Sequence, residues 1–234
     1  MKRAVWQLLA VLGTDALLLA ILLYMTLGGM GRKETREADS GAEGVIEMPA
    51  EKTIALTFDD GPHPIYTKEL LEGLRERGVK ATFFLMGANI EGNEELVLEM
   101  ERDGHLIGNH GFRHEQMTEE GTEAVCESVE ETGSLIKAIT GKKPEYLRPP
   151  YGAWSEELAE ELNLTPVFWS VDSLDWKYEN TSQITQRVLK KVKNGDVILM
   201  HDIFSTSVEA ALEIIDTLQA QGYTFVTADE LIVD

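Results

Sequence analysis

The stretch Thr57-Phe58-Asp59-Asp60-Gly61-Pro62 decides the fold, because it places two adjacent carboxylates where a strand ends. The apolar run before it, residues 54–56, is typical of a strand buried in a sheet. Gly61 and Pro62 then stop the strand and turn the chain. Neighbouring strand residues point to opposite faces, so one carboxylate could bind a metal while the other accepts a proton. Taken alone, the tetrapeptide Asp-Asp-Gly-Pro is more typical of a surface turn.

Short apolar strands alternate with helical patterns from Lys52 onward. This alternation predicts an α/β fold in which parallel strands are covered by helices. Seven strands could close into a barrel or remain an open, doubly wound sheet, and both architectures gather functional residues at the carboxyl ends of the strands. The expected strands are Thr53–Phe58, Ala81–Met86, His105–Asn109, Tyr146–Arg148, Pro166–Val171, Asp196–His201 and Tyr223–Val226.

Two histidines follow one of the predicted strand ends, and several other strand ends also carry polar residues. His110 and His114 are four residues apart, so a helical turn or a compact loop can aim both rings at one point. Two neutral imidazoles and one carboxylate form a ligand set for a divalent ion that leaves positions for water and substrate. Paired with Asp60, the two histidines therefore predict a metal site. We interpret His63 and His105 as structural.

Five segments in this order resemble the five motifs of the polysaccharide deacetylase family (NodB homology domain, carbohydrate esterase family 4). They are TFDDGP at 57–62, HGFRH at 110–114, RPPYG at 148–152, DSLDW at 172–176 and LMH at 199–201. The resemblance covers the chain from about Lys52 to its end. It implies a distorted (β/α) barrel of about seven parallel strands and a metal-dependent hydrolase that removes N-acetyl groups from amino sugars.

The resemblance also implies a role for each matching residue. Asp60, His110 and His114 would hold a divalent ion, most often zinc in this family. Asp59 would be the general base, with Arg148 as its partner, and His201 the general acid, with Asp175 as its partner. The backbone N–H of Tyr151 would help to stabilise the oxyanion, and Tyr151, Trp176 and Leu199 would contact the substrate.

Three other residues in or beside these motifs leave alternatives open. Asp172 could replace Asp175 as the partner of His201, and Asp202 could cap the helix that follows. The second motif usually has Ser or Thr where this chain has Gly111. That hydroxyl is expected to steady the ligand loop, and the sequence predicts that Gly111→Ser would keep or raise metal affinity.

The composition excludes some functions and leaves others open. The net charge of −20 argues against a nucleic-acid-binding protein, and the single cysteine excludes an intrachain disulfide. The resemblance implies that the partner is an N-acetylated polysaccharide, and a membrane tether facing the wall favours peptidoglycan over chitin-like, exopolysaccharide and xylan substrates. Alternatives are a catalytically silent wall-binding or sporulation module, and a metal-dependent phosphohydrolase built on the Asp-Asp pair.

The N-terminal segment predicts a membrane anchor. Residues 1–30 are largely apolar, and about 20 such residues suffice to cross a bilayer as a helix. Residues 31–50 are polar and lack periodicity, as expected of a flexible linker, and 51–234 would be the catalytic domain. The sequence therefore predicts a single-pass protein of the cell membrane, and the family resemblance implies that its catalytic domain lies outside the cytoplasm.

Overall fold

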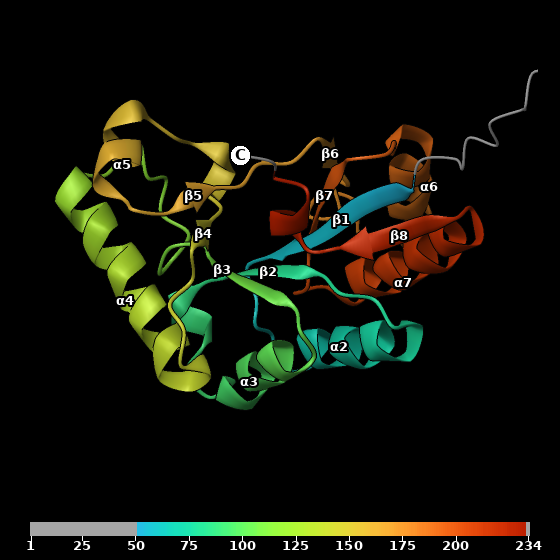
Figure 1. Ribbon diagram of the computed structural model, residues 1–234, viewed down its shortest axis with the longest axis horizontal. Coiled ribbons are helices and arrows are strands. Elements are labelled where there is room, and N and C mark those ends of the chain that lie inside the picture. Colours follow the sequence, from blue (N-terminus) through green and yellow to red (C-terminus); the bar gives the residue numbers. More distant parts are fainter. Residues whose placement is uncertain (1–50, 233–234) are drawn as a thin grey trace, which may run out of the picture. The chain divides into compact units, whose positions relative to one another are not determined.

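The computed structural model describes residues 51–232, in which strands and helices alternate along the chain (Figure 1). The anchor and linker predicted for residues 1–50 lie outside the described residues. Between 51 and 232, no helix has both the length and the apolar character that crossing a membrane requires. The strands are β1 (Lys52–Asp59), β2 (Thr82–Leu85), β3 (Leu106–Asn109), β4 (Tyr146–Leu147), β5 (Thr165–Pro166), β6 (Val171–Asp172), β7 (Val197–His201) and β8 (Tyr223–Val226).

Helices connect these strands and lie outside the sheet (Figure 1). The α-helices are α2 (Tyr66–Arg77), α3 (Glu94–Arg102), α4 (Thr122–Thr140), α5 (Glu156–Glu161), α6 (Thr181–Lys191) and α7 (Ser205–Ala220). The described residues also form three short 3-10 helices, η1 (Gly87–Asn89), η2 (Pro150–Gly152) and η3 (Ala228–Glu230). Helix α2 ends at Gly78, whose φ of +63° is a left-handed conformation that suits glycine and stops the helix.

All strand pairs in the described residues are parallel, in the order β5-β4-β3-β2-β1-β7-β6. β8 pairs with the first half of β1 as an eighth strand. The expected parallel α/β fold is therefore confirmed, and its curved sheet remains open between β5 and β6.

The predicted strand Pro166–Val171 is wrong, because the chain forms two separate strands there. The Val167 N–H donates to the Leu147 carbonyl at 2.8 Å, whereas the Ser170 N–H donates to the Val197 carbonyl at 3.0 Å. The short segment 167–170 therefore crosses from the β4 side of the opening to β7. Its apolar composition resembles that of a single strand, which is why the sequence did not show the crossing.

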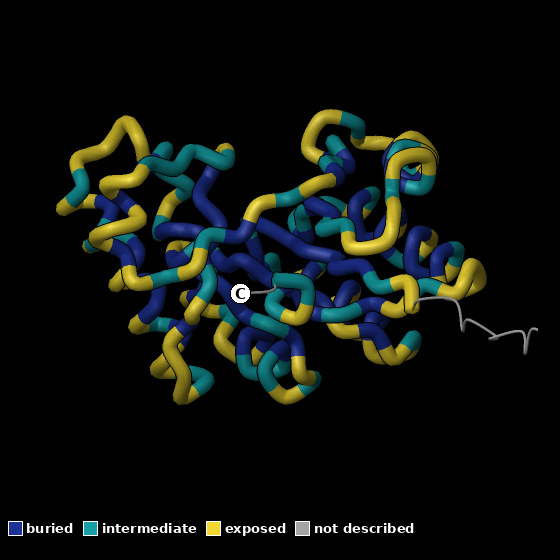
Figure 2. Tube along the Cα trace, turned by 45° about the horizontal axis from the view of Figure 1, so that its top comes forward, coloured by how far each residue is buried: buried dark blue, intermediate teal, exposed yellow. Residues whose placement is uncertain are grey.

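β1 is buried on both faces, as its continuous apolar sequence predicts for a central parallel strand. Its outward residues, among them Phe58, pack with the helices in the main core. Its inward residues begin with Ala55, in a smaller inner cluster with Phe84 and Val167, and continue to Thr57 and Asp59. Buried segments run through the middle of the molecule and exposed ones lie on the peripheral loops (Figure 2). The inner face of β1 thus leads directly to its carboxyl end.

Candidate active site

The register of the sheet brings four of the predicted site residues to one edge. Asp59 of β1 lies beside His201 of β7. The last residue of β3 pairs with the last residue of β4, so His110 and Arg148 follow their strands at the same level. The edge formed by the carboxyl ends of parallel strands is where α/β folds place their sites.

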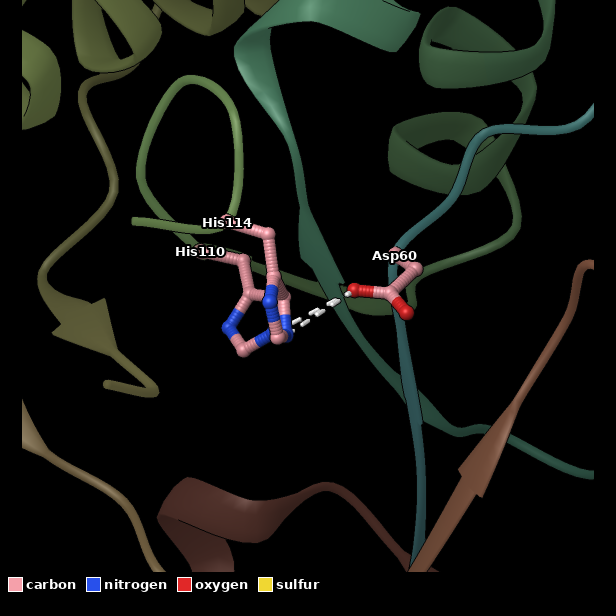
Figure 3. A group of neighbouring side chains, drawn as sticks. All are labelled: Asp60, His110 and His114. Carbon is pink, nitrogen blue, oxygen red and sulfur yellow. Dashed lines mark ion pairs between the residues drawn. The ribbon is translucent and has the colours of Figure 1, made fainter. Parts of the chain in front are cut away.

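Asp60, His110 and His114 bring one ligand atom each to a common point, and these atoms all lie within 4.8 Å of one another (Figure 3). The Asp60 Oδ1 is 3.4 Å from the His110 Nε2 and 3.6 Å from the His114 Nε2. This buried oxygen has no hydrogen-bond partner within residues 51–232. A carboxylate oxygen without a hydrogen bond, close to two imidazole nitrogens, is an arrangement that fits the ligands of a divalent ion.

A hydrogen bond at Nδ1 orients the His110 imidazole so that its Nε2 can bind an ion. Its Nδ1 lies 2.7 Å from the carbonyl oxygen of Arg148, an acceptor, so Nδ1 carries the proton and the Nε2 lone pair faces Asp60. Burial, and secondarily the charge of His110, lower the pKa of His114. Both rings are therefore suited to act as neutral ligands.

Asp60 reaches the histidines because it lies just beyond the strand in a left-handed conformation, with φ of +72°. The Asn89 side chain donates to its carbonyl at 2.7 Å and helps to hold this turn. Burial raises the pKa of Asp60, but the facing residues His110, His201 and His114 lower it overall. The carboxylate is therefore ionised and available as a ligand.

Asp59 is paired with a completely buried arginine. The Arg148 Nη1 donates to the Asp59 Oδ1 at 2.8 Å and to the Thr57 hydroxyl at 2.6 Å. The guanidinium also donates to the carbonyls of Val167 and Phe168, so the crossing segment helps to fix it. The other carboxylate oxygen of Asp59 lies 3.8 Å from the His110 Nε2 and faces the ligand set.

Asp175 is the partner of His201, and the alternative, Asp172, is wrong. The Asp175 Oδ1 lies 2.8 Å from the His201 Nδ1, whereas the Asp172 carboxylate accepts the Leu174 N–H at 2.8 Å. Burial lowers the pKa of His201, but Asp175 and the other nearby carboxylates raise it to about 9. The His201 Nε2 lies 4.0 Å from the Asp60 Oδ2, beside the ligand set.

The three residues predicted to contact substrate differ in exposure. Leu199 is buried two residues before His201, on the same inward face of β7. Tyr151 and Trp176 are 68% and 54% exposed, although both are large aromatic residues. The Tyr151 ring packs edge-on against His114, with centroids 4.5 Å apart. An exposed aromatic beside the ligand set is suited to contact a sugar ring.

His63 and His105 have structural roles, as expected. The His63 Nδ1 accepts the N–H groups of Ile65 and Tyr66 at the start of α2, and the His105 Nδ1 accepts the Ala81 N–H. Both rings therefore serve the backbone and lie outside the ligand set.

Asp202 does not cap the following helix. Phe204 is the residue at the N-terminal cap of α7, and Asp202 is completely buried and accepts a hydrogen bond from the Thr67 hydroxyl. Burial raises the pKa of Asp202 to about 7. The Asp202 carboxylate lies so close to Gly61 that a Cβ there would meet its oxygens at 2.5 Å. The Asp202 carboxylate therefore packs against the turn that follows Asp60. The spacing of residues in the sequence does not reveal this contact.

The structure reverses the expectation for Gly111→Ser. Gly111 has φ of +75°, a conformation that strains any residue with a Cβ. A Cβ would also lie 3.3 Å from the Glu115 Oε2 and 3.4 Å from the Met117 Cε. Serine at this position therefore adds strain to the loop that joins the two histidines.

Comparison with known proteins agrees with this geometry. Residues 47–167 match the family model described as polysaccharide deacetylase. The chain is 42% identical to the peptidoglycan-N-acetylglucosamine deacetylase PgdA of Listeria monocytogenes, over 80% of this chain and 41% of that protein. It is 38% identical to the peptidoglycan-N-acetylmuramic acid deacetylase PdaC of Bacillus subtilis, over 78% of this chain and 39% of that protein. The chain thus spans about two fifths of the length of these relatives.

The fold matches a solved structure of one of these relatives. The structure of peptidoglycan deacetylase PdaC from Bacillus subtilis superposes with a TM-score of 0.77 and 38% identity, covering 79% of this chain and 91% of that chain.

Proposed function

Because this chain belongs to the polysaccharide deacetylase family, we propose that it is a metal-dependent hydrolase that removes N-acetyl groups from the amino sugars of a polysaccharide. The observation that carries the proposal is the convergence of Asp60, His110 and His114 between two further groups, Asp59 and His201. Amide hydrolysis needs a base for the attacking water and an acid for the departing amine. The site has a candidate for each.

Asp59 is the proposed general base. Its Oδ1 is occupied by Arg148, which leaves Oδ2, on the side of the ligand set, to take a proton from water. The buried guanidinium fixes the orientation of this carboxylate.

His201 is the proposed general acid. Its Nδ1 is held by Asp175, so Nε2 is the atom that delivers a proton to the amine nitrogen. With its pKa raised to about 9, the ring carries that proton at neutral pH. The Tyr151 N–H is proposed to donate to the oxyanion, while Leu199 and Trp176 bound the space for the acetyl group and the sugar.

Asp60, His110 and His114 would hold the ion, and we propose zinc because two imidazoles and one carboxylate are a common set for catalytic zinc. A divalent ion there would supply Lewis acidity to the acetyl carbonyl and to the attacking water. The completely buried Arg148 carbonyl accepts the His110 Nδ1–H. This hydrogen bond fixes one ligand before any ion binds.

Peptidoglycan is the proposed polymer, supported by the names of PgdA and PdaC. These relatives act on different sugars, so the proposal includes N-acetylglucosamine and N-acetylmuramic acid. We further propose that residues 1–30 anchor the protein in the cell membrane with the catalytic unit outside, where it would reach the wall. A silent wall-binding module would need neither a base nor an acid beside the ligand set, whereas the oriented Asp59 and His201 are candidates for these two roles.

The test is acetate release by the full-length protein in detergent. Peptidoglycan and oligomers of N-acetylglucosamine would be offered with added zinc and with chelator. We expect zinc-dependent acetate release that falls at least about 100-fold in Asp59→Asn, the usual scale of general-base catalysis. Asp172→Asn is the matched control, since within residues 51–232 its carboxylate accepts only the Leu174 N–H. Zinc binding without acetate release from any polymer would favour the silent module.

A further inference from the structure

The loop that joins the two histidine ligands is held by side chains from outside the motif. Asn109 begins the loop, accepts the Gly111 N–H with its side-chain oxygen at 2.8 Å and donates to the Val129 carbonyl of α4. The Thr132 hydroxyl of α4 donates to the Gly111 carbonyl at 3.0 Å. These contacts fix the first half of the loop, next to His110.

The second half of the loop is held by a different pair of side chains, beside the Ala88 N–H, which donates to the Phe112 carbonyl at 2.9 Å. The Ser128 hydroxyl of α4 accepts the Phe112 N–H at 2.8 Å and lies within 3.3 Å of the Glu115 Oε2, to which it donates. The same Glu115 oxygen accepts the Arg113 N–H at 2.9 Å. One hydroxyl and one carboxylate thus fix the two consecutive N–H groups that precede His114.

We propose that Ser128 and Glu115 are positioning residues for the metal, replacing the hydroxyl that Gly111 lacks. A Cβ on Gly111 would lie 3.3 Å from the Glu115 Oε2 and 3.6 Å from the Ser128 Oγ. The two polar groups therefore occupy the space that a side chain at 111 would enter. The Ser128 hydroxyl of helix α4 thus takes the place of a hydroxyl within the loop, and Gly111 keeps its left-handed conformation.

His114 needs this support more than His110 does. The His110 ring is fixed by the Arg148 carbonyl, whereas His114 has a backbone φ of +63°, a left-handed conformation that is unfavourable for a residue with a side chain. Such a conformation persists only where the surroundings determine it. Loss of the Ser128–Glu115 pair should therefore release His114 from the ligand set while His110 stays in place.

The inference rests on the proposed metal site and is tested by metal binding in the full-length protein. Zinc affinity would be measured by competition with a chromophoric chelator, and the ligand set by the visible spectrum of bound cobalt. We expect Ser128→Ala and Glu115→Ala to weaken zinc binding about 10- to 100-fold, the usual effect of losing an outer contact to a ligand. The cobalt spectrum should change with them. Glu115→Gln keeps an acceptor oxygen and should remain near wild type.

Ser134→Ala is the matched control, because Ser134 lies exposed on the same helix and bonds only Glu130 in the described structure. Zinc affinity within twofold of wild type in Ser128→Ala, whatever its melting temperature, would overturn the inference and leave the proposed function intact. Equal losses in Glu115→Gln and Glu115→Ala would also overturn it. Failure of the wild-type protein to bind zinc would instead overturn the metal site itself.

Discussion

Asp175 holds His201 at two points: its Oδ1 lies 2.8 Å from the His201 Nδ1, and its Oδ2 accepts the His201 backbone N–H at 2.7 Å. Burial lowers the pKa of His201, but this carboxylate helps to raise it to about 9. A histidine with a raised pKa keeps its proton below that pKa and loses it as the pH rises through it. His201 therefore loses its proton, and with it the proposed role of general acid, at alkaline pH.

We expect Asp175→Asn to move the alkaline limb of kcat to lower pH by roughly 1–3 pH units, the usual effect of removing an adjacent opposite charge. A bound divalent ion would lower the pKa of His201 in both proteins, so they are compared with the same metal. Asp172→Asn should leave the limb in place. An unchanged limb in Asp175→Asn would remove His201 as the group that titrates there.

Arg148 offers a test of the buried ion pair with Asp59. Its pKa is lowered by burial, although Asp59 opposes this, and the side chain is completely buried. Arg148→Met leaves the Asp59 carboxylate without its cation, and breaking such a buried pair usually costs about 3–5 kcal/mol. We expect a loss of that size in the free energy of unfolding, measured with urea.

The matched control for Arg148 is a surface pair of the same kind. The Arg77 Nε donates to the Asp216 Oδ1 at 2.7 Å, but the Asp216 side chain is 57% exposed. Arg77→Met should therefore cost at most about 1 kcal/mol. If the two variants lost equal stability, burial would not be the reason for the importance of Arg148.

The sequence predicted the parts of the site that follow strand ends. Asp59 and Asp60 stand out because a buried strand stops there, and the spacing of His110 and His114 limits where their rings can point. The resemblance supplied the pairing of Asp175 with His201, which spacing alone left open against Asp172. Each of these predictions depends on residues close in sequence or on known motifs.

Contacts between distant segments were not predictable in the same way. Ser128 lies on a helix whose amphipathic pattern shows which face is buried, but not that one hydroxyl reaches the Phe112 N–H. Thr57 looked like an ordinary strand residue, yet its hydroxyl accepts a hydrogen bond from Arg148. Such contacts are set by how α4 and the sheet pack, which short-range periodicity does not encode.

Gly111 gives a prediction opposite to the one from the motif alone. Because its φ is +75° and a Cβ would crowd Glu115, we expect Gly111→Ser to weaken zinc binding. Gly111→Ala should weaken zinc binding similarly, since the strain comes from the Cβ that both residues carry. Chelator competition on both variants is the measurement. Tighter zinc binding by Gly111→Ser alone would show that the hydroxyl outweighs the strain.

His105 gives a prediction for stability far from the ligand set. Burial lowers its pKa to about 4 from its ordinary value of 6.5, and its Nδ1 accepts the Ala81 N–H. Near pH 6, His105 therefore binds a proton in the unfolded chain but stays neutral in the folded protein. The free energy of unfolding consequently falls as the pH drops below about 6.5. This contribution should reduce the free energy of unfolding by about 2 kcal/mol between pH 7 and pH 5.

His105→Gln removes the titrating group, so the variant should lose less stability than the wild type over the same pH range. Urea unfolding of both proteins at pH 7 and pH 5 gives the difference directly, because Asp202 and the other titrating groups are common to both. The two proteins should differ in the pH dependence of unfolding, whatever the variant costs at pH 7. Parallel losses would mean that His105 is protonated inside the folded protein, with the Ala81 N–H then left without its acceptor.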